Sequence, residues 1–198
     1  MKYEITELPK DEWEGTYIDF DYPASEYFDV VLTEDDNSFR VEMVKKQFEN
    51  PFIHKDEGDF PSKLFPDYWE GARVFGIVDR EGGKKELLAC IEIWSEEWSN
   101  RMMVTELWVS EKLRRQGIGT ALMNKAKEIA KEQNRRAIIL ETQSCNVVAI
   151  AFYRSQGFKL IGFDTCCYTN KDIEKREVRF NMGFFMRNVS EGTVPIDT

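Results

Sequence analysis

The sequence predicts an α/β (α+β) fold, in which a mixed central β-sheet contains one βαβα unit and ends in a C-terminal hairpin. Residues 101–109 are apolar and rich in strand-forming types, and the apolar residues of 118–130 recur at helical spacing. A short apolar strand follows at 137–141, and then a helix over 146–158 that is stopped by Gly157. This order of elements predicts parallel strands joined by a right-handed crossover.

The rest of the chain is expected to add antiparallel strands. With 198 residues, of which 42% are hydrophobic, the chain can bury one sizeable core, and we expect a single domain over 1–198. Further strands are expected at 3–8, 27–32, 39–44, 73–79, 86–95, 159–168 and 178–186. Prolines and a glycine predict a long loop over 49–72, a candidate wall for a ligand site. The tail 188–198 is polar, and we expect it to be frayed or used in homodimer contacts.

A glycine-rich loop lies between the 101–109 strand and the helix that follows it. Its sequence is Arg114-Arg115-Gln116-Gly117-Ile118-Gly119-Thr120. Glycine lets backbone N–H groups approach an anion without a side chain in the way. The start of the following helix adds unpaired N–H groups and the positive end of its dipole. The loop therefore predicts a pyrophosphate site.

Known phosphate-binding motifs differ in the residues that they require. A Walker loop needs a Gly-Lys-Ser/Thr run that this chain lacks, and a dinucleotide fingerprint needs glycine where Leu122 stands. A plain polar turn is a further alternative, which the flanking strand and helix disfavour. Arg114, Gly117 and Gly119 match the Arg/Gln-x-x-Gly-x-Gly/Ala loop of the GNAT N-acetyltransferases, which holds the pyrophosphate of acetyl-CoA. The loop resembles that family.

A second motif strengthens the resemblance. The segment 146–158 is similar to the GNAT pattern Asn-x-x-Ala-x-x-x-Tyr-x-x-x-Gly-Phe, through Asn146, Ala149, Tyr153, Gly157 and Phe158. Residues 140–143, 152–153, 157–159 and 164–165 are similar to streptothricin acetyltransferases in particular, and 27–30 and 48–53 more loosely. The resemblance covers about 70–187. It implies a GNAT fold with the βαβα unit as acetyl-CoA-binding core, and residues 1–69 as a variable part that forms the acceptor-site wall.

The resemblance also implies where acetyl-CoA would bind. Its pantetheine arm would pair with the strand edge at Leu107, Trp108 and Val109, where the family strand carries a bulge, and a backbone N–H there would polarise the carbonyl. Its pyrophosphate would lie on residues Arg114 to Thr120. Asn146 could bind the pantetheine arm or cap its helix, and Ala149 and Tyr153 complete the expected contacts.

Acetyl transfer to an amine requires a base, because an alkylammonium titrates near ~10.4. Glu106 is our first candidate, since it precedes the cofactor loop on its strand, with Glu92 and Glu141 as reserves or as ligands for a cationic substrate. Asp164 is a further expected substrate contact. In the family a tyrosine on the second helix protonates the leaving thiolate, and Tyr153 occupies that position. Simple packing of the Tyr153 ring is the alternative.

Charge and composition restrict the partners. A net charge of −9 and a pI near 4.9 argue against nucleic acid and anionic membranes, and they favour a polycationic substrate. A single histidine, His54, and four cysteines without ligand spacing give no reason to expect a metal. No apolar run long enough for a membrane span and no signal-peptide pattern are present, so we expect a cytoplasmic protein.

Three functions are compatible with these residues. The first is acetylation of a cationic antibiotic, streptothricin, at its β-lysine amine, which would confer resistance. The second is acetylation of another amine, on a polyamine, an aminoglycoside or a protein lysine. The third is an acyl-CoA-binding module without catalysis, which Tyr153 and the strand carboxylates disfavour.

Overall fold

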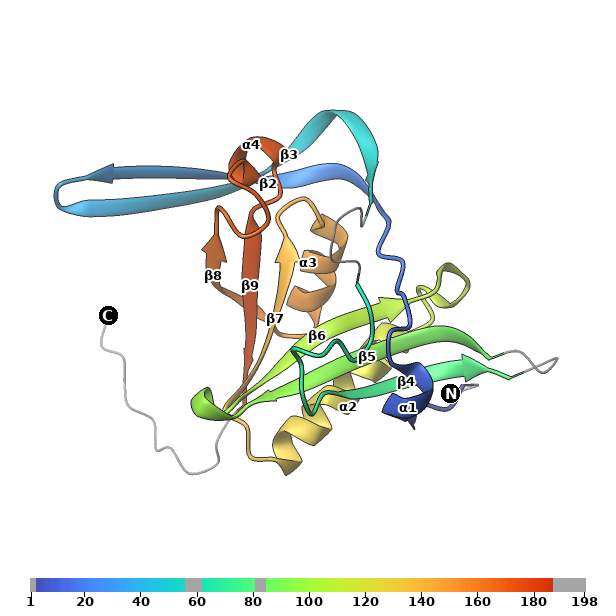
Figure 1. Ribbon diagram of the computed structural model, residues 1–198. Helices are drawn as coiled ribbons and strands as arrows, with labels where there is room; N and C mark the ends of the chain where they lie inside the picture. The colour runs from blue at the N-terminus through green and yellow to red at the C-terminus, as the bar shows by residue number, and fades with distance from the viewer. Residues whose placement is uncertain (1–2, 56–61, 81–84, 187–198) are drawn as a thin grey trace.

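The computed structural model describes residues 3–55, 62–80 and 85–186. Seven strands form one sheet in the order β1-β4-β5-β6-β7-β9-β8, and β2 and β3 pair separately as a long hairpin arm that projects from the body (Figure 1). The sheet strands are β1 (Thr6–Leu8), β4 (Arg73–Asp79), β5 (Glu86–Glu96), β6 (Arg101–Val109), β7 (Ala137–Gln143), β8 (Lys159–Asp164) and β9 (Arg179–Phe185). The arm consists of β2 (Tyr22–Asp35) and β3 (Ser38–His54). The helices are α1 (Lys10–Trp13), α2 (Ile118–Glu132), α3 (Val147–Ser155) and α4 (Asp172–Lys175), with 3-10 turns η2 (Glu97–Ser99) and η3 (Glu111–Leu113).

The predicted mixed sheet with a βαβα unit is confirmed. Strands β4, β5 and β6 form the antiparallel meander, and β6 pairs with β7 in parallel after the α2 crossover. The expected C-terminal hairpin is present, since β8 and β9 are antiparallel. Strand β9 lies between β7 and β8, so the last strand of the described residues joins the hairpin to the βαβα unit.

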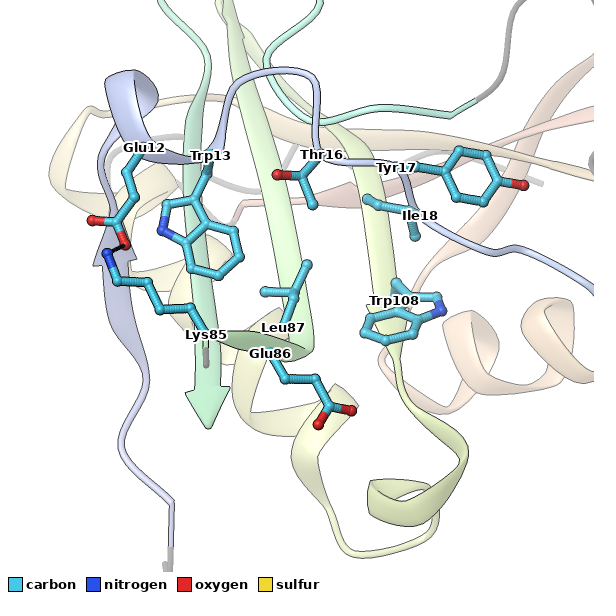
Figure 2. Close-up of a pocket in the computed structure, with 9 residues that line it drawn as sticks. All are labelled: Glu12, Trp13, Thr16, Tyr17, Ile18, Lys85, Glu86, Leu87 and Trp108. Carbon is cyan, nitrogen blue, oxygen red and sulfur yellow. Dashed lines mark hydrogen bonds and ion pairs between the residues drawn. The ribbon is translucent and has the colours of Figure 1, made fainter. Parts of the chain in front are cut away.

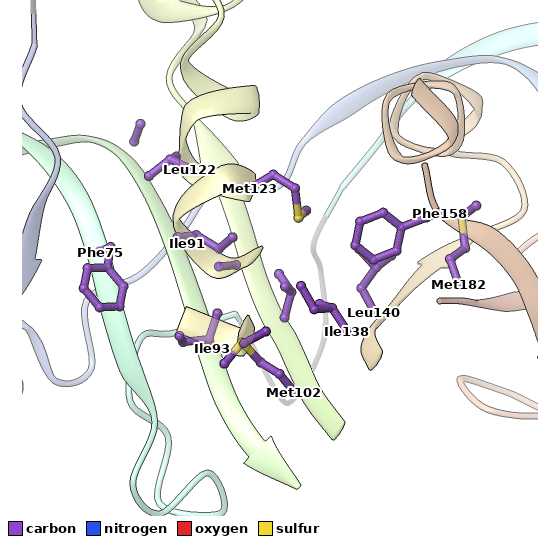
Figure 3. Packing of buried hydrophobic residues seen from close by; sticks show 14 of the residues in the cluster. Phe75, Ile91, Ile93, Met102, Leu122, Met123, Ile138, Leu140, Phe158 and Met182 are labelled. Atoms are coloured by element: carbon purple, nitrogen blue, oxygen red, sulfur yellow. The ribbon is translucent and has the colours of Figure 1, made fainter. Parts of the chain in front are cut away.

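The main core lies between the sheet and α2. Leu122 and Met123 of α2 belong to one buried cluster with Ile91 of β5 and Met102 of β6 (Figure 3). The core continues across β7 and β9 to Phe158, which follows α3. The apolar face that the helical spacing predicts for α2 is therefore its buried face, and it fixes the start of the helix over the end of β6.

A second, smaller core covers the opposite face of the sheet. Residues before β2 and before β4 fold over β4 and β5 there, through Trp13, Ile18, Leu64 and Phe65. The backbone of residues 15–18 is hydrogen-bonded to that of residues 62–64. These two segments form one layer, which lies next to the strand residues that carry the candidate carboxylates.

Several predicted strand bounds are wrong, among them those of β2, which runs over Tyr22–Asp35 instead of 27–32. Strand β3 continues to His54, although residues 49–54 are predicted as loop; Glu26 pairs with Gln47 and Ala24 with Phe52, so Pro51 lies in an irregular stretch where its missing N–H costs nothing. Strand β8 ends at Asp164 instead of continuing to 168, because the chain turns there and its backbone N–H groups bond to the Asp164 and Asp172 side chains.

The parallel pair β6 and β7 stays together for only a short distance. Residues 101–103 pair with 137–139, and beyond them the two strands diverge (Figure 1). The glycine loop follows β6 and α3 follows β7, so both stand at the open end of the gap. The fold therefore produces a cavity beside the predicted cofactor loop.

Candidate active site

A cavity of about 720 Å³ lies where β6 and β7 separate. One wall is residues 104–107 of β6, and the opposite wall is residues 140–143 of β7 with Asn146 and Tyr153 at and in α3. The base of the arm, residues 52–55, closes a third side. Of the predicted site residues, the cavity brings together Glu106, Leu107, Glu141, Asn146 and Tyr153. Part of the predicted 49–72 wall also lines it, through 52–55 and Ser62.

The glycine loop has the backbone shape that an anion site requires. Arg115 and Gly117 both adopt left-handed conformations, with φ of 60° and 80°. Helix α2 begins at Ile118 with no side chain capping it and no acidic residue in its first turn. A Cβ at Gly117 would meet nothing within 4 Å, so the space over the loop is open. These features leave N–H groups and a positive helix end for an anion.

Gly119 has a second reason to be glycine. A Cβ there would lie 3.3 Å from Cζ of Phe152, in α3, which is closer than most real Cβ contacts. Gly119 therefore lets the start of α2 pack against α3, next to Tyr153. The sequence alone predicts only the approach of a ligand at this glycine, and the packing contact with Phe152 is an additional requirement.

The two arginines of the loop, Arg114 and Arg115, have different surroundings. Nε of Arg114 donates to the Val109 carbonyl at 3.1 Å, which ties the loop back to the end of β6. The Arg115 guanidinium makes no hydrogen bond or ion pair within the described ranges. Thr120 accepts a hydrogen bond from the Gln156 side chain at 3.3 Å, which links α2 to the end of α3. Arg115 is thus the loop cation that is available to an anionic ligand.

The edge of β6 presents backbone groups to the gap. Ser110 N–H donates to Leu88 in β5, and the Val109 carbonyl bonds Arg114 instead. Because strand N–H groups alternate in direction, those of Val109 and Leu107 point away from β5, toward the gap. That of Trp108 faces β5, so Trp108 is not part of this edge. The expected bulge lies earlier, at Thr105, and not within 107–109.

Glu106 and Tyr153 both line the cavity. Burial raises the pKa of the Tyr153 hydroxyl, and the Glu106 carboxylate raises it further. The Tyr153 hydroxyl has no hydrogen-bond partner among the residues that the structure describes. A protonated, unpartnered hydroxyl is therefore present near a carboxylate, as acid and base for one proton-transfer reaction require.

Glu141 also lines the cavity, from β7. Its Oε2 lies 2.8 Å from Nε of Arg179, and its side chain is 44% exposed toward the cavity. Burial of the surrounding site raises the pKa of Glu141, while Arg179 opposes that shift and Asp164 adds to it. One oxygen of the Glu141 carboxylate is thus fixed by Arg179, a geometry that suits a substrate ligand more than a mobile base.

Three predicted contacts lie elsewhere. Glu92, in β5 opposite Glu106, is fully buried and is not among the residues that line the cavity. Asp164 bonds the N–H of Cys166 at the end of β8 and does not line the cavity either. Ala149 lies in the first turn of α3, where its N–H donates to the Asn146 side chain at 3.1 Å.

Trp108 lines a different hollow, of about 480 Å³, on the second-core side of the sheet. Figure 2 shows Leu87 between the indoles of Trp108 and Trp13. Trp108 donates its indole N–H to the Asp19 carbonyl at 2.8 Å. The hollow's two carboxylates are neutralised, Glu12 by Lys85 and Glu86 by Lys112. Nothing in this hollow matches acid–base chemistry.

The residues at the base of the arm are not predictable as cavity residues from the sequence. His54 stacks on Tyr22, with ring centroids 4.7 Å apart, and its Nε2 lies 3.3 Å from the Glu177 carboxylate. Tyr22 donates to Gln143 at 2.8 Å, and its hydroxyl lies 3.2 Å from the sulfur of Cys145. All of these except Cys145 line the cavity. They join strand ends that are far apart in sequence, which no local pattern in the chain signals.

In residues 3–55, 62–80 and 85–186, no group of three or more His, Cys, Asp or Glu side chains converges as metal ligands do. None of the helices in those ranges has the length and apolar character needed to cross a membrane.

Comparison with known proteins agrees with this geometry. Residues 40–158 match the Acetyltransferase (GNAT) family, so the chain belongs to the GNAT family and is an N-acetyltransferase. It is 31% identical over 130 residues to Streptothricin acetyltransferase A of Bacillus subtilis (strain 168), covering 62% of this chain and 75% of the relative. It is 30% identical over 97 residues to the Streptothricin acetyltransferase of Streptomyces lavendulae, covering 49% and 50% of the two chains.

Solved structures show the same fold. The crystal structure of nourseothricin acetyltransferase superposes with a TM-score of 0.69 at 23% identity, over 93% of this chain and 99% of that one. A protein from Bacillus anthracis str. Ames, solved in complex with acetyl coenzyme A, gives a TM-score of 0.67 at 22% identity, over 93% and 97%. The likeness covers nearly the whole chain.

Proposed function

We propose that this N-acetyltransferase transfers the acetyl group of acetyl-CoA to a primary amine of a cationic small molecule, the β-lysine amine of streptothricin, and so confers resistance to it. The proposal depends most directly on one observation: Glu106 and Tyr153 share a cavity beside an open, uncapped anion loop. The similarity to Streptothricin acetyltransferase A supports the choice of acceptor.

The described residues fit the donor that the family uses. Acetyl-CoA supplies an acetyl group already activated as a thioester. The N–H groups of 115–120 and the Arg115 guanidinium would hold its diphosphate, and the β6 edge at Leu107 and Val109 would pair with the amide groups of its pantetheine arm. A donor bound this way would lie along the gap between β6 and β7, with its reactive end in the cavity.

In the proposed reaction, Glu106 accepts one proton and Tyr153 donates another. An alkylammonium keeps its proton at neutral pH and cannot attack until a base removes it, a role for Glu106. Tyr153 donates to the leaving sulfur. Its raised pKa keeps the hydroxyl protonated, so that a proton is available for the thiolate.

Thiol release from acetyl-CoA, measured with purified protein and a panel of amines, tests the proposal. The panel contains streptothricin, a polyamine, an aminoglycoside and a lysine peptide. We expect kcat/KM for streptothricin to exceed the others by about 100-fold, because a site that pairs buried polar groups with its substrate rejects analogues strongly. A higher kcat/KM for another amine would identify that amine, and not streptothricin, as the preferred acceptor. Acetyl-CoA binding without thiol release on any amine would favour a non-catalytic module.

A further inference from the structure

Glu92 is a buried carboxylate without a cationic partner in the described part of the chain. Its side chain is fully buried in the middle of β5. Oε1 accepts a hydrogen bond from the backbone N–H of Phe65 at 2.7 Å, and Oε2 accepts one from the Thr105 hydroxyl at 3.0 Å. Burial raises the pKa of Glu92 and these two bonds lower it. Because an unpaired buried carboxylate is costly, its retention calls for a reason.

The Thr105 end of this contact is a β-bulge. Glu92 pairs with Glu106 and Ile93 pairs with Val104, so Thr105 is an extra residue in β6. Before the bulge, Val104 packs into the core under α2, and after it Leu107 and Val109 do so. The extra residue therefore reverses which side chains face α2.

Glu106 depends on this reversal. In a regular strand, residues 104 and 106 would share a face, and Glu106 would point into the core under α2. With the bulge, Glu106 instead shares the face of Glu92 and Trp108, and it lines the cavity. The bulge is the feature that presents the candidate base to the acceptor.

The other end of the contact holds a strained loop. Phe65 has φ of 53°, a left-handed conformation that a bulky aromatic residue rarely adopts. Its N–H bonds Glu92, and the same segment reaches the cavity at Ser62. Two donors, one N–H and one O–H, converge on Glu92, and a carboxylate has an acceptor oxygen for each.

We infer that Glu92 is a positioning residue that clamps the Thr105 bulge to the Phe65 backbone and so keeps Glu106 in the cavity. The inference deepens the proposed function and rests on it, since it requires Glu106 to act as the base. Glu92 itself touches no substrate. Its effect on catalysis passes through Glu106.

The matched pair Thr105→Val and Thr105→Ser tests the clamp. Valine keeps the shape of threonine and removes the hydroxyl, whereas serine keeps the hydroxyl. We expect T105V to lower kcat ten- to a hundredfold, about the cost of a slightly misplaced catalytic group, with KM for acetyl-CoA unchanged. T105S should retain kcat within about twofold. Glu92→Gln should be intermediate, because one amide oxygen can still accept from Phe65 while the Thr105 hydroxyl turns to accept from the amide.

The double variant T105V/E106Q separates positioning from general stability. If the bulge acts through Glu106, the double variant should be no slower than E106Q alone. An added loss equal to that of T105V alone would overturn the inference, as would full activity of T105V and E92Q. A wild-type protein that acetylates no amine, or an E106Q variant with unchanged kcat, would instead overturn the proposed function or its base, and the clamp with it. Thermal unfolding of each variant is measured in parallel.

Discussion

At the residue scale, the proposed mechanism depends on a tyrosine that must keep its proton. Burial and the neighbouring Glu106 both raise the pKa of Tyr153 above the ordinary phenol value near ~10. A raised pKa means that the hydroxyl is a donor throughout the neutral and mildly alkaline range. Loss of activity through deprotonation of Tyr153 is therefore expected only at pH above the ordinary value.

Tyr153→Phe should lower kcat by about 10²- to 10³-fold, the usual contribution of a positioned general acid. The ring of phenylalanine fills the same space, and the hydroxyl has no partner in the described ranges, so affinity for acetyl-CoA and the melting temperature should change little. Steady-state kinetics, calorimetric binding and thermal unfolding measure the three quantities. A Tyr153→Phe variant with the wild-type kcat would show that Tyr153 is not the general acid.

Glu106→Gln should lower kcat/KM by about 10²- to 10⁴-fold at neutral pH. The loss should shrink as pH approaches the amine's own pKa, near ~10.4, because the substrate then arrives already neutral. A pH series of the wild-type to variant ratio measures this. Glu141→Gln is the control. Because this variant removes a proposed substrate ligand and not the base, it should raise KM across the pH range. A constant ratio for E106Q would contradict its role as base.

The sequence motifs and the requirements of acetyl transfer predict Tyr153, Glu106 and Asn146 as site residues, and all three line the cavity. They are predictable because each has a fixed place in the local order of elements along the βαβα unit. The face that Glu106 occupies could not be predicted, because a single extra residue in β6 reverses strand alternation and periodicity does not reveal which residue is extra. His54 was not predicted as a cavity residue because its position depends on the register of β2 against β3. Long-range register leaves no mark on the local pattern.

At the element scale, α3 begins with a side-chain cap. The Asn146 side chain accepts from the Ala149 N–H at 3.1 Å, and Asn146 also lines the cavity. Asn146→Ala should destabilise the protein by about 1 kcal/mol, whereas Asn146→Asp keeps an acceptor and should cost far less. Denaturant unfolding measures both. If N146D is stable but binds acetyl-CoA more weakly, Asn146 has both roles; equal stability of N146A and wild type would contradict the cap.

The arm is fastened to the body by Asp29. Its carboxylate, 10% exposed, accepts from Lys46 at 2.6 Å and from Arg176, next to α4, at 2.8 Å. The Lys46 hydrogen bond is the main cause that lowers the pKa of Asp29, burial opposes it, and Arg176 lowers it further. A lowered folded pKa stabilises the protein above the unfolded value, near ~3.9, and this stabilisation is lost as pH falls through the folded pKa.

Asp29→Asn should therefore reduce the free energy of unfolding at pH 7 by about 1.5–3 kcal/mol, the range for charged hydrogen bonds. The difference from wild type should shrink below pH ~4 and disappear at lower pH. Glu26→Gln is the matched control on the same hairpin, because the Glu26–Lys45 pair is more exposed and should contribute about 0–1 kcal/mol. A D29N effect that persists at low pH would point to packing instead of charge.

Elements were predictable where periodicity is strong. The strands 73–79 and 101–109 were predicted with the bounds of β4 and β6, and α2 has the predicted apolar face. Only the parts 27–32 and 39–44 of the arm are predicted as strands, because Pro51 and the polar composition of the later residues of β3 do not indicate a strand. In the pairing of β2 with β3, the four residues 48–51 stand opposite the single residue 25. A pattern of hydrophobic residues does not predict such an irregularity. The same holds for β9, whose place between β7 and β8 is a property of the whole sheet.

At the scale of the whole molecule, charge affects the encounter with the substrate. The chain carries a net charge of −9, and the cavity contains the carboxylates of Glu106, Glu141 and Glu177 with the cations of Lys55 and Lys175. Local charges in the cavity nearly balance. Any preference for a polycation in the encounter must therefore come from the field of the whole surface, which salt screens.

Raising salt from 0.05 to 0.5 M should therefore raise KM several-fold for a polycationic acceptor and much less for an amine with one charge, because the Debye length falls to a few ångströms. The acetyl-CoA loop complicates the test, since added anions compete for the same N–H groups and Arg115. Measuring KM for acetyl-CoA at each salt concentration separates the two effects. If both amines respond equally while KM for acetyl-CoA stays constant, the long-range field plays no part. The preference for an acceptor would then be set inside the cavity, by groups such as Glu141 and Glu177.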